Sequence, residues 1–153
     1  MDVRYINPFI QGLLDVVAML GMTSIVRTGL GKKTYLQTEN EVNIIIGLTG
    51  EVKGNIVFST PEATAKNIAS AMMAGVPVEK LDLISKSALC ELANMIAGNS
   101  AAKLEGLGVK FNVTPPTLIT GKNLLALISQ VETLVINFAG NEGPLEMNVA
   151  LEM

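Results

Sequence analysis

Apolar residues recur at helical spacing near the start of the chain. In residues 7–20 an apolar side chain returns about every third or fourth position. This spacing predicts an amphipathic helix, with Pro8 in its first turn and Gly21 at its end.

Two further helices are predicted in the middle of the chain. The segment 59–62 combines two hydroxyl residues, a proline and a glutamate, which favours a helix start with a hydroxyl as the cap. This helix should run through the methionines that precede Gly75. After a Val-Pro break, a longer helix should span residues 80–105 and stop at Gly106 and Gly108.

β-Branched and alternating residues predict strands on both sides of these helices. The runs 42–48 and 52–59 flank Thr49-Gly50-Glu51 and indicate a hairpin. The stretch 23–40 is ambiguous, and we expect one short strand somewhere within it. Four further strands are predicted after the long helix: 110–113, 117–120, 131–138 and 145–153.

The last of these strands alternates most regularly. From Leu145 to Met153 every second residue is apolar, while Glu146, Asn148 and Glu152 point the other way. This pattern is typical of a half-buried antiparallel strand. At an unprotected sheet edge it would be an aggregation hazard, which favours pairing with a second copy. The alternative interpretation is an internal strand.

Helices set between two groups of strands predict an α+β fold. We expect an antiparallel β-sheet with two long helices packed on it and an N-terminal helix. A chain of 153 residues has the usual size of one globular domain, so residues 1–153 are expected to form a single domain.

Composition excludes several kinds of chemistry. The chain has no histidine, one cysteine and a net charge of −3. The absence of histidine rules out Ser-His-Asp and Cys-His nucleophile systems, and one cysteine builds neither an internal disulfide nor a thiolate zinc site. The acidic balance, the lack of a basic cluster and an aromatic content of 4% argue against nucleic-acid binding.

The expected environment of the protein is the cytoplasm. Hydrophobic residues make up 49% of the chain, but no apolar run approaches the roughly 20 residues of a membrane span, so no membrane insertion is expected. The first residues lack the basic and then apolar layout of a signal peptide.

Motifs for nucleotide chemistry are missing. Gly121-Lys122-Asn123 lacks the remaining residues of a phosphate-binding loop, and the glycines at 29 and 31 do not continue into a dinucleotide-binding pattern. Scattered carboxylates form no calcium or magnesium loop, so no metal site of the chain's own is expected. Cys90 has helical apolar neighbours and is interpreted as a packed thiol rather than a nucleophile.

The long predicted helix carries the main candidate site. At about 100° per residue, six of its side chains fall within about 40° of one direction. They are Ser87, Glu91, Asn94, Gly98, Ala101 and Glu105. The first half of this stripe offers hydrogen-bonding groups, and the second half is mostly small, so a partner's backbone could approach closely. An ordinary solvated helix face would also look like this.

The residues Ser87-x-x-x-Glu91-x-x-Asn94, followed by Pro115-Pro116, resemble the signature of the CheC/CheX/FliY group of chemotaxis phosphatases. The hairpin, the alanine-rich helix before Gly75 and the tail Val113-Thr-Pro-Pro-Thr are similar to CheX in order and spacing. CheC-type members typically carry two Glu-x-x-Asn helices, and this chain has one. The resemblance therefore indicates a CheX-like chain with the CheC/CheX-like fold.

The resemblance implies a role for each site residue. These phosphatases hydrolyse the aspartyl phosphate of the response regulator CheY, so Asn94 would position the attacking water. Glu91 would engage the active-site lysine of the regulator. Ser87, Gly98 and Pro116 would be supporting or partner-binding residues. The resemblance also implies that the regulator supplies Mg²⁺, that the chain needs no cofactor of its own, and that it forms a homodimer through β-strands.

Two other functions stay open at this point. A chain of this kind could bind a receiver domain without hydrolysing its phosphate, as a flagellar-switch-like interaction module does. It could also serve as a dimerisation or scaffold protein that uses the same sheet. Removal of the Asn94 side chain separates an enzyme from a binder.

Overall fold

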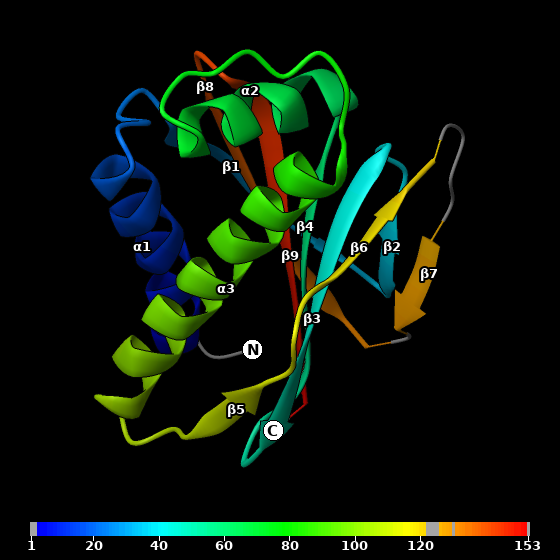
Figure 1. The fold of residues 1–153 in the computed structure, drawn as a ribbon. Coiled ribbons are helices and arrows are strands. Elements are labelled where there is room, and N and C mark those ends of the chain that lie inside the picture. Colours follow the sequence, from blue (N-terminus) through cyan, green and yellow to red (C-terminus); the bar gives the residue numbers. More distant parts are fainter. Residues whose placement is uncertain (1–2, 122–125, 130, 153) are drawn as a thin grey trace.

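A sheet of seven antiparallel strands is the centre of the fold (Figure 1). The computed structural model describes residues 3–121, 126–129 and 131–152. The strands pair in the order β1-β8-β9-β4-β3, and β5 and β6 follow one another along the outer edge of β3. Their bounds are β1 Val26–Lys33, β3 Val42–Gly50, β4 Lys53–Thr60, β5 Phe111–Val113, β6 Thr117–Thr120, β8 Thr133–Gly140 and β9 Gly143–Glu152.

The helices in the described residues cover one face of this sheet. They are α1 (Val3–Met19), α2 (Glu62–Met72) and α3 (Leu83–Glu105). α1 and α3 lie side by side, and α2 packs near the start of α3 (Figure 1). Helices and sheet share one core, in which Phe9 and Met147 are fully buried. The predicted α+β fold on an antiparallel sheet is therefore confirmed.

A second, two-stranded sheet lies on the other side. It consists of β2 (Leu36–Thr38) and β7 (Ala126–Ser129). Leu36 packs there against Val57 of β4 and Ala150 of β9. The face of the main sheet that points away from the helices is thus partly covered as well.

The predicted hairpin is formed by β3 and β4, which pair from Val42↔Thr60 to Leu48↔Gly54. Gly50 in the turn has φ +110°, a conformation that side chains other than glycine rarely adopt. Turn chemistry and β-branched runs together made this hairpin readable from the sequence.

The C-terminal strand is internal, which corrects the edge interpretation. β9 pairs with β8 on one side and β4 on the other. Leu145, Met147 and Val149 face the core as predicted, but Asn148 and Ala150 on the opposite face are fully buried too, because β2 covers that side. The strand is therefore not half-buried, and its apolar pattern gives no independent reason to expect a dimer.

The first helix begins earlier than predicted. α1 starts at Val3, so Pro8 lies inside the helix rather than in its first turn. Proline removes one backbone hydrogen bond there. The helix extends upstream because Ile6, which lies one turn before Phe9, is buried in the same core as Phe9 and Leu13.

The predicted hydroxyl cap of the second helix is wrong. Pro61 occupies the cap position of α2, and no side chain caps the helix. The Thr60 hydroxyl instead donates to the carbonyl of Pro144 at 2.8 Å. Residues 59 and 60 belong to β4, so sheet pairing takes the residues that would otherwise cap the helix.

Three strands were not resolved by the sequence pattern. The stretch 23–40 contains two strands, β1 and β2, rather than one. β1 is exposed along most of its length and lacks apolar alternation, so its pairing with β8 is what orders it. β7 falls in a stretch where no strand was predicted. Strands of this kind depend on long-range partners.

No helix of the described residues is long and apolar enough to span a membrane. The cytoplasmic location stays a prediction.

α1 and α3 pack closely against each other at Gly12. A Cβ atom added there would overlap the Ser100 hydroxyl and lie 3.2 Å from the Ser100 nitrogen. Ser100 is fully buried and cannot turn into solvent. Beside this crossing, the Lys103 ammonium lies 3.0 Å from the Asp15 carboxylate. The absence of a side chain at Gly12 thus sets how tightly α3 sits on α1.

We predict that Gly12→Ala lowers the free energy of unfolding by about 1–3 kcal/mol, because the added methyl overpacks the helix contact. Urea denaturation measures the effect. Gly98→Ala is the matched control, since a Cβ there meets nothing within 4 Å. The control should gain roughly 0.5–1 kcal/mol from better helix propensity. Equal stabilisation by both substitutions would contradict the close crossing.

Candidate functional site

The start of α3 is fixed by reciprocal hydrogen bonds. The Ser85 N–H donates to Asp82 Oδ1 at 2.9 Å, and the Asp82 N–H donates to the Ser85 hydroxyl at 2.8 Å. These bonds form a capping box, which places the helix start at Leu83 rather than near Lys80 as predicted. The bonds from the Ser85 backbone and hydroxyl hold the pKa of Asp82 below its usual range, because they stabilise the ionised carboxylate.

α3 has a packed side and an exposed side. The predicted stripe lies on the exposed side, where only Ala101 is half-buried. The opposite side packs against α1, α2 and the sheet. Its buried residues are Ser85, Leu89, Leu92, Ala93, Ile96, Ala97, Ser100 and Leu104. The stripe is thus presented to solvent by a helix of 23 residues that is anchored along its whole length.

Glu91 and Asn94 are neighbours on this exposed side. They are three positions apart, which places their Cβ atoms about 5–6 Å from each other on the same helix face. Both side chains are exposed, and so is Ser87, one turn before Glu91. A carboxylate that accepts hydrogen bonds therefore stands beside an amide that both donates and accepts them.

Gly98 is exposed one turn beyond Asn94. The fold does not require a glycine here, since a Cβ atom would meet no neighbour within 4 Å. Glycine in a helix interior costs about 1 kcal/mol relative to alanine. Because Gly98 has no side chain, it leaves the helix backbone exposed next to the amide of Asn94.

A hollow of about 540 Å³ adjoins this end of the stripe. α3 contributes Gly98, Ala101, Ala102 and Glu105, and the hairpin turn and β5 contribute Gly50, Glu51, Lys110, Phe111 and Asn112. The Lys110 N–H donates to Glu51 Oε2 at 3.2 Å across its wall. The residues from the turn and β5 were not found from the sequence, because only the pairing of β3 with β5 brings them to α3.

Pro116 lies on a different element from the rest of the motif. It is half-buried in the linker between β5 and β6. This linker is tied to β3, because the Thr114 N–H donates to the Gly47 carbonyl at 2.9 Å and the Gly47 N–H donates to the Thr114 hydroxyl at 2.8 Å. α3 contacts both flanking strands. The proline segment therefore runs beside α3, whereas Ser87, Glu91, Asn94 and Gly98 share one face of α3 itself.

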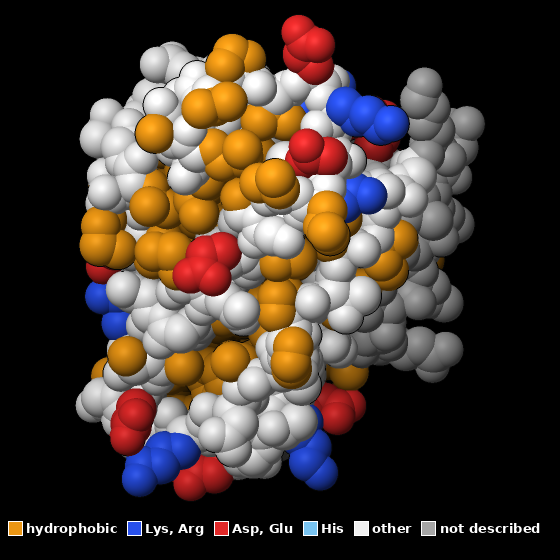
Figure 2. Space-filling view, viewed as in Figure 1, with side chains coloured by type: hydrophobic (Ala, Val, Ile, Leu, Met, Phe, Trp, Pro, Cys, Tyr) orange, Lys and Arg blue, Asp and Glu red, His pale blue; other side chains and the backbone are white. Residues whose placement is uncertain are grey.

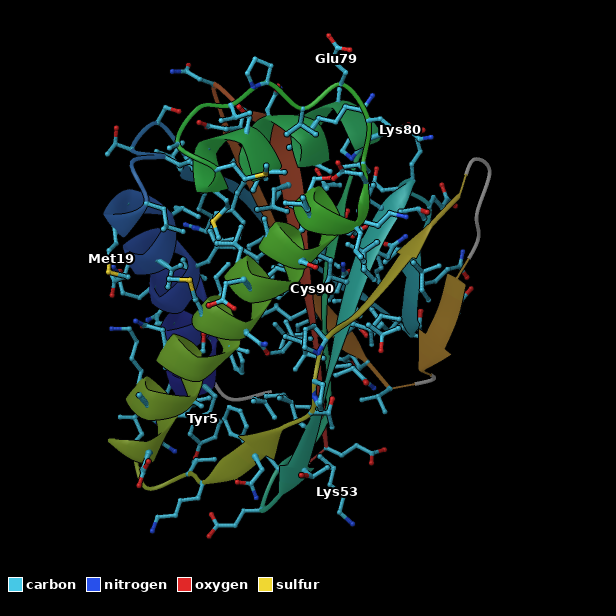
Figure 3. All side chains as sticks on the ribbon, viewed as in Figure 1. Tyr5, Met19, Lys53, Glu79, Lys80 and Cys90 are labelled. Atoms are coloured by element: carbon cyan, nitrogen blue, oxygen red, sulfur yellow. The ribbon has the colours of Figure 1, made fainter. Side chains whose placement is uncertain are left out.

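Cys90 also lies on α3, where it is half-buried (Figure 3). Burial raises the pKa of its thiol, since a thiolate is poorly solvated there. A thiol with a raised pKa is a weak nucleophile, which agrees with its interpretation as a packed residue. Among the side chains of the described residues, no three Asp, Glu or Cys groups come together as metal ligands.

Figure 2 views the molecule from the side of α3. Apolar side chains are spread over the upper and middle parts of this face with a few acidic ones among them, and further charged side chains lie at the upper right and along the lower edge. Exposed apolar side chains therefore lie around the stripe, and such side chains are common in the core of a protein interface.

Sequence comparison identifies relatives of this chain. Residues 42–139 match the family model of chemotaxis phosphatase CheX. The chain is also similar to a Thermotoga maritima protein named CheY-P phosphatase CheX. The two are 35% identical over 126 residues, which is 81% of this chain and 80% of the relative.

Two solved structures are similar over nearly the whole chain. A CheC-like superfamily protein from Shewanella sp. PV-4 has 25% identity and a TM-score of 0.89, with all of both chains covered. The second is the CheX-CheY-BeF3-Mg²⁺ complex from Borrelia burgdorferi. Its matching chain has 29% identity and a TM-score of 0.82, with 97% of this chain and 98% of that one covered.

We predict that Asp82→Ala destabilises the protein at neutral pH and that the difference from wild type shrinks towards pH 3. The pKa of Asp82 is lower in the folded state than in the unfolded state, so its contribution is present above the unfolded value, near 4, and is lost as pH falls through the folded value. Thermal unfolding at several pH values measures this. A difference that stays constant with pH would contradict the prediction.

Proposed function

Because the chain belongs to the CheX family of chemotaxis phosphatases, we propose that it hydrolyses the aspartyl phosphate of a CheY-type response regulator. The observation that carries this proposal is the position of Glu91 and Asn94, side by side and exposed on a helix whose other side is packed. The name of the Thermotoga relative and the CheY complex of the Borrelia relative support it. The whole chain would act as one phosphatase domain.

The proposed reaction is the attack of water on an acyl phosphate. A P–O bond forms to water as the P–O bond to the regulator's aspartate breaks, which gives inorganic phosphate and a free carboxylate. Asn94 would enter the regulator's active site and hold one water in line with phosphorus. A side-chain amide suits this task, because it donates and accepts hydrogen bonds without titrating. Fixing the water supplies orientation, as a water-positioning Gln does in GTPases.

Glu91 would pair with the active-site lysine of the regulator. A charge-assisted hydrogen bond between carboxylate and ammonium is stronger than a neutral one and sets the register of docking. Since Glu91 stands one turn from Asn94, this pair would fix the amide over the phosphoryl group. The regulator's own Mg²⁺ would neutralise the charge on the phosphate, so the phosphatase would need no cofactor of its own. The Borrelia complex, which contains Mg²⁺, is consistent with this division.

The remaining motif residues would shape the docking surface. Ser87 is exposed one turn before Glu91 and could bond to the rim of the regulator's active site. Gly98 would let the partner's backbone approach the helix closely. Pro116 would stiffen the linker that runs beside α3.

We also propose that the protein is a homodimer formed through β-strands, as the family resemblance implies. Support within the fold comes from β1, an edge strand of the main sheet. Its Val26 and Leu30 are exposed apolar residues, and an edge strand offers unpaired backbone groups.

The catalytic proposal predicts that Asn94→Ala slows dephosphorylation of the regulator by about 100-fold, since the water loses its orientation. Glu91→Gln should lower kcat/KM by roughly 10- to 100-fold through the lost ion pair. The measurement is the decay of phosphorylated regulator in excess Mg²⁺. Asn7→Ala, which removes an exposed amide from α1, is the matched control and should behave as wild type.

Binding of the beryllofluoride-loaded regulator separates a phosphatase from a non-catalytic binding module. Asn94→Ala should keep most of its affinity, because the amide acts in the transition state. A wild-type protein that binds the regulator but never speeds its decay would be a binding module, and the catalytic proposal would be wrong.

The dimer proposal predicts a solution mass of about twice 16.2 kDa. Size-exclusion chromatography with light scattering measures it over a range of concentrations. A mass of one chain throughout that range would rule out a stable dimer.

A further inference from the structure

Two large apolar side chains protrude from the first turn of α3. Leu83 is 81% exposed and Ile84 is 66% exposed. They lie four and three positions before Ser87, so they share its helix face and flank the start of the stripe. Exposed apolar residues need no explanation when they occur singly, but these two are adjacent and stand in line with Glu91 and Asn94.

Folding does not account for this pair. The buried residues of α3 lie on the other side of the helix, and the start of α3 is set by the Asp82–Ser85 capping box. First-turn positions of a helix also favour small polar or acidic residues over Leu and Ile. Something other than the stability of the chain must benefit from Leu83 and Ile84.

Their distance from the site suits a docked domain. Leu83 precedes Asn94 by eleven positions, and Glu105 follows it by eleven, so each end of the stripe lies about 16 Å from Asn94 along the axis. A protein interface of ordinary size covers ~800 Å² on each partner, which corresponds to a circle with a radius of about 16 Å. An interface centred on Asn94 therefore reaches Leu83 and Ile84.

The two ends of the stripe differ in chemistry. The end near Glu105 borders the hollow with its charged wall, which contains Glu51 and Lys110. The end near Leu83 instead presents the exposed apolar side chains of Leu83 and Ile84, with Asp82 and Lys86 beside them. Burial of apolar area supplies affinity without requiring exact charge pairing, whereas the polar groups in the middle provide the chemistry.

We propose that Leu83 and Ile84 form an apolar anchor for the receiver domain of the regulator and determine how tightly it docks, not how fast the phosphate is hydrolysed. This inference rests on the proposed function. The occupant is the receiver domain because the anchor is continuous with the surface that must contact it when Asn94 reaches the phosphoryl group. The partner must then present an apolar patch about 15 Å from its phosphorylated aspartate.

The test compares wild type with Leu83→Ser, Ile84→Ser and the double variant. Serine is well tolerated in a first helical turn, so α3 should stay intact, which circular dichroism checks. Met19→Ser is the matched control, because Met19 is 69% exposed but lies at the end of α1, away from the stripe (Figure 3). Leu83→Met tests whether an apolar side chain restores docking.

Two quantities are measured for each variant: the KM and kcat for the phosphorylated regulator in Mg²⁺, and the Kd for the beryllofluoride-loaded regulator. The double variant should raise KM and Kd together by about 10- to 100-fold, as expected for losing two aliphatic side chains that the partner buries in part. Its kcat at saturation should stay within about twofold of wild type, since uniform binding affects KM alone. Met19→Ser and Leu83→Met should stay close to wild type.

The outcomes separate the anchor from the proposed function. If wild type hydrolyses the phosphate and the double variant has unchanged KM and Kd, the anchor is wrong and the function stands. A fall in kcat with unchanged KM also overturns the anchor. If wild type binds the regulator without hydrolysis and the double variant binds it more weakly, the anchor stands and the catalytic proposal fails. If wild type does not bind the regulator, both fail.

Discussion

The burial of one side of α3 against α1 and the sheet is the constraint on which the rest of the molecule depends. Leu89, Leu92 and Ile96 are buried on that side, and a 3.6-residue repeat then forces Glu91 and Asn94 outward. The close contact of Gly12 with Ser100 sets the depth of the helix, and the Asp82 capping box sets its first residue. Orientation of the site is therefore a consequence of packing.

How far the sequence predicts the fold depends on where the ordering interactions lie. The β3–β4 hairpin and α3 are readable because their turn residues and apolar repeats are local. β1 and β7 are not, since their order comes from strands more than eighty residues away. The predicted starts of α1 and α2 were wrong for the same reason. Burial of Ile6 outweighs the local signal of Pro8, and the pairing of β4 outweighs the capping signal of residues 59 and 60.

The candidate site also contains residues that local geometry predicts and residues that only long-range pairing brings together. Helical geometry alone places Ser87, Glu91 and Asn94 on one face, and the structure gives that face to solvent. Helical geometry could also have placed Leu83 and Ile84 on this face, because they precede Ser87 by one turn. The wall of the hollow was not, because Glu51 and Lys110 meet α3 only through the pairing of β3 with β5.

In the proposed mechanism the phosphatase contributes position rather than reactive groups. A chain without histidine and with one packed cysteine can still speed hydrolysis if its partner carries the metal and the phosphoryl group. The most direct measurement is a crystal structure of this protein with a beryllofluoride- and Mg²⁺-loaded CheY-type regulator. We expect the Asn94 amide within about 3.5 Å of a water in line with beryllium and Glu91 beside the regulator's lysine. A complex in which this face of α3 remains in solvent would contradict it.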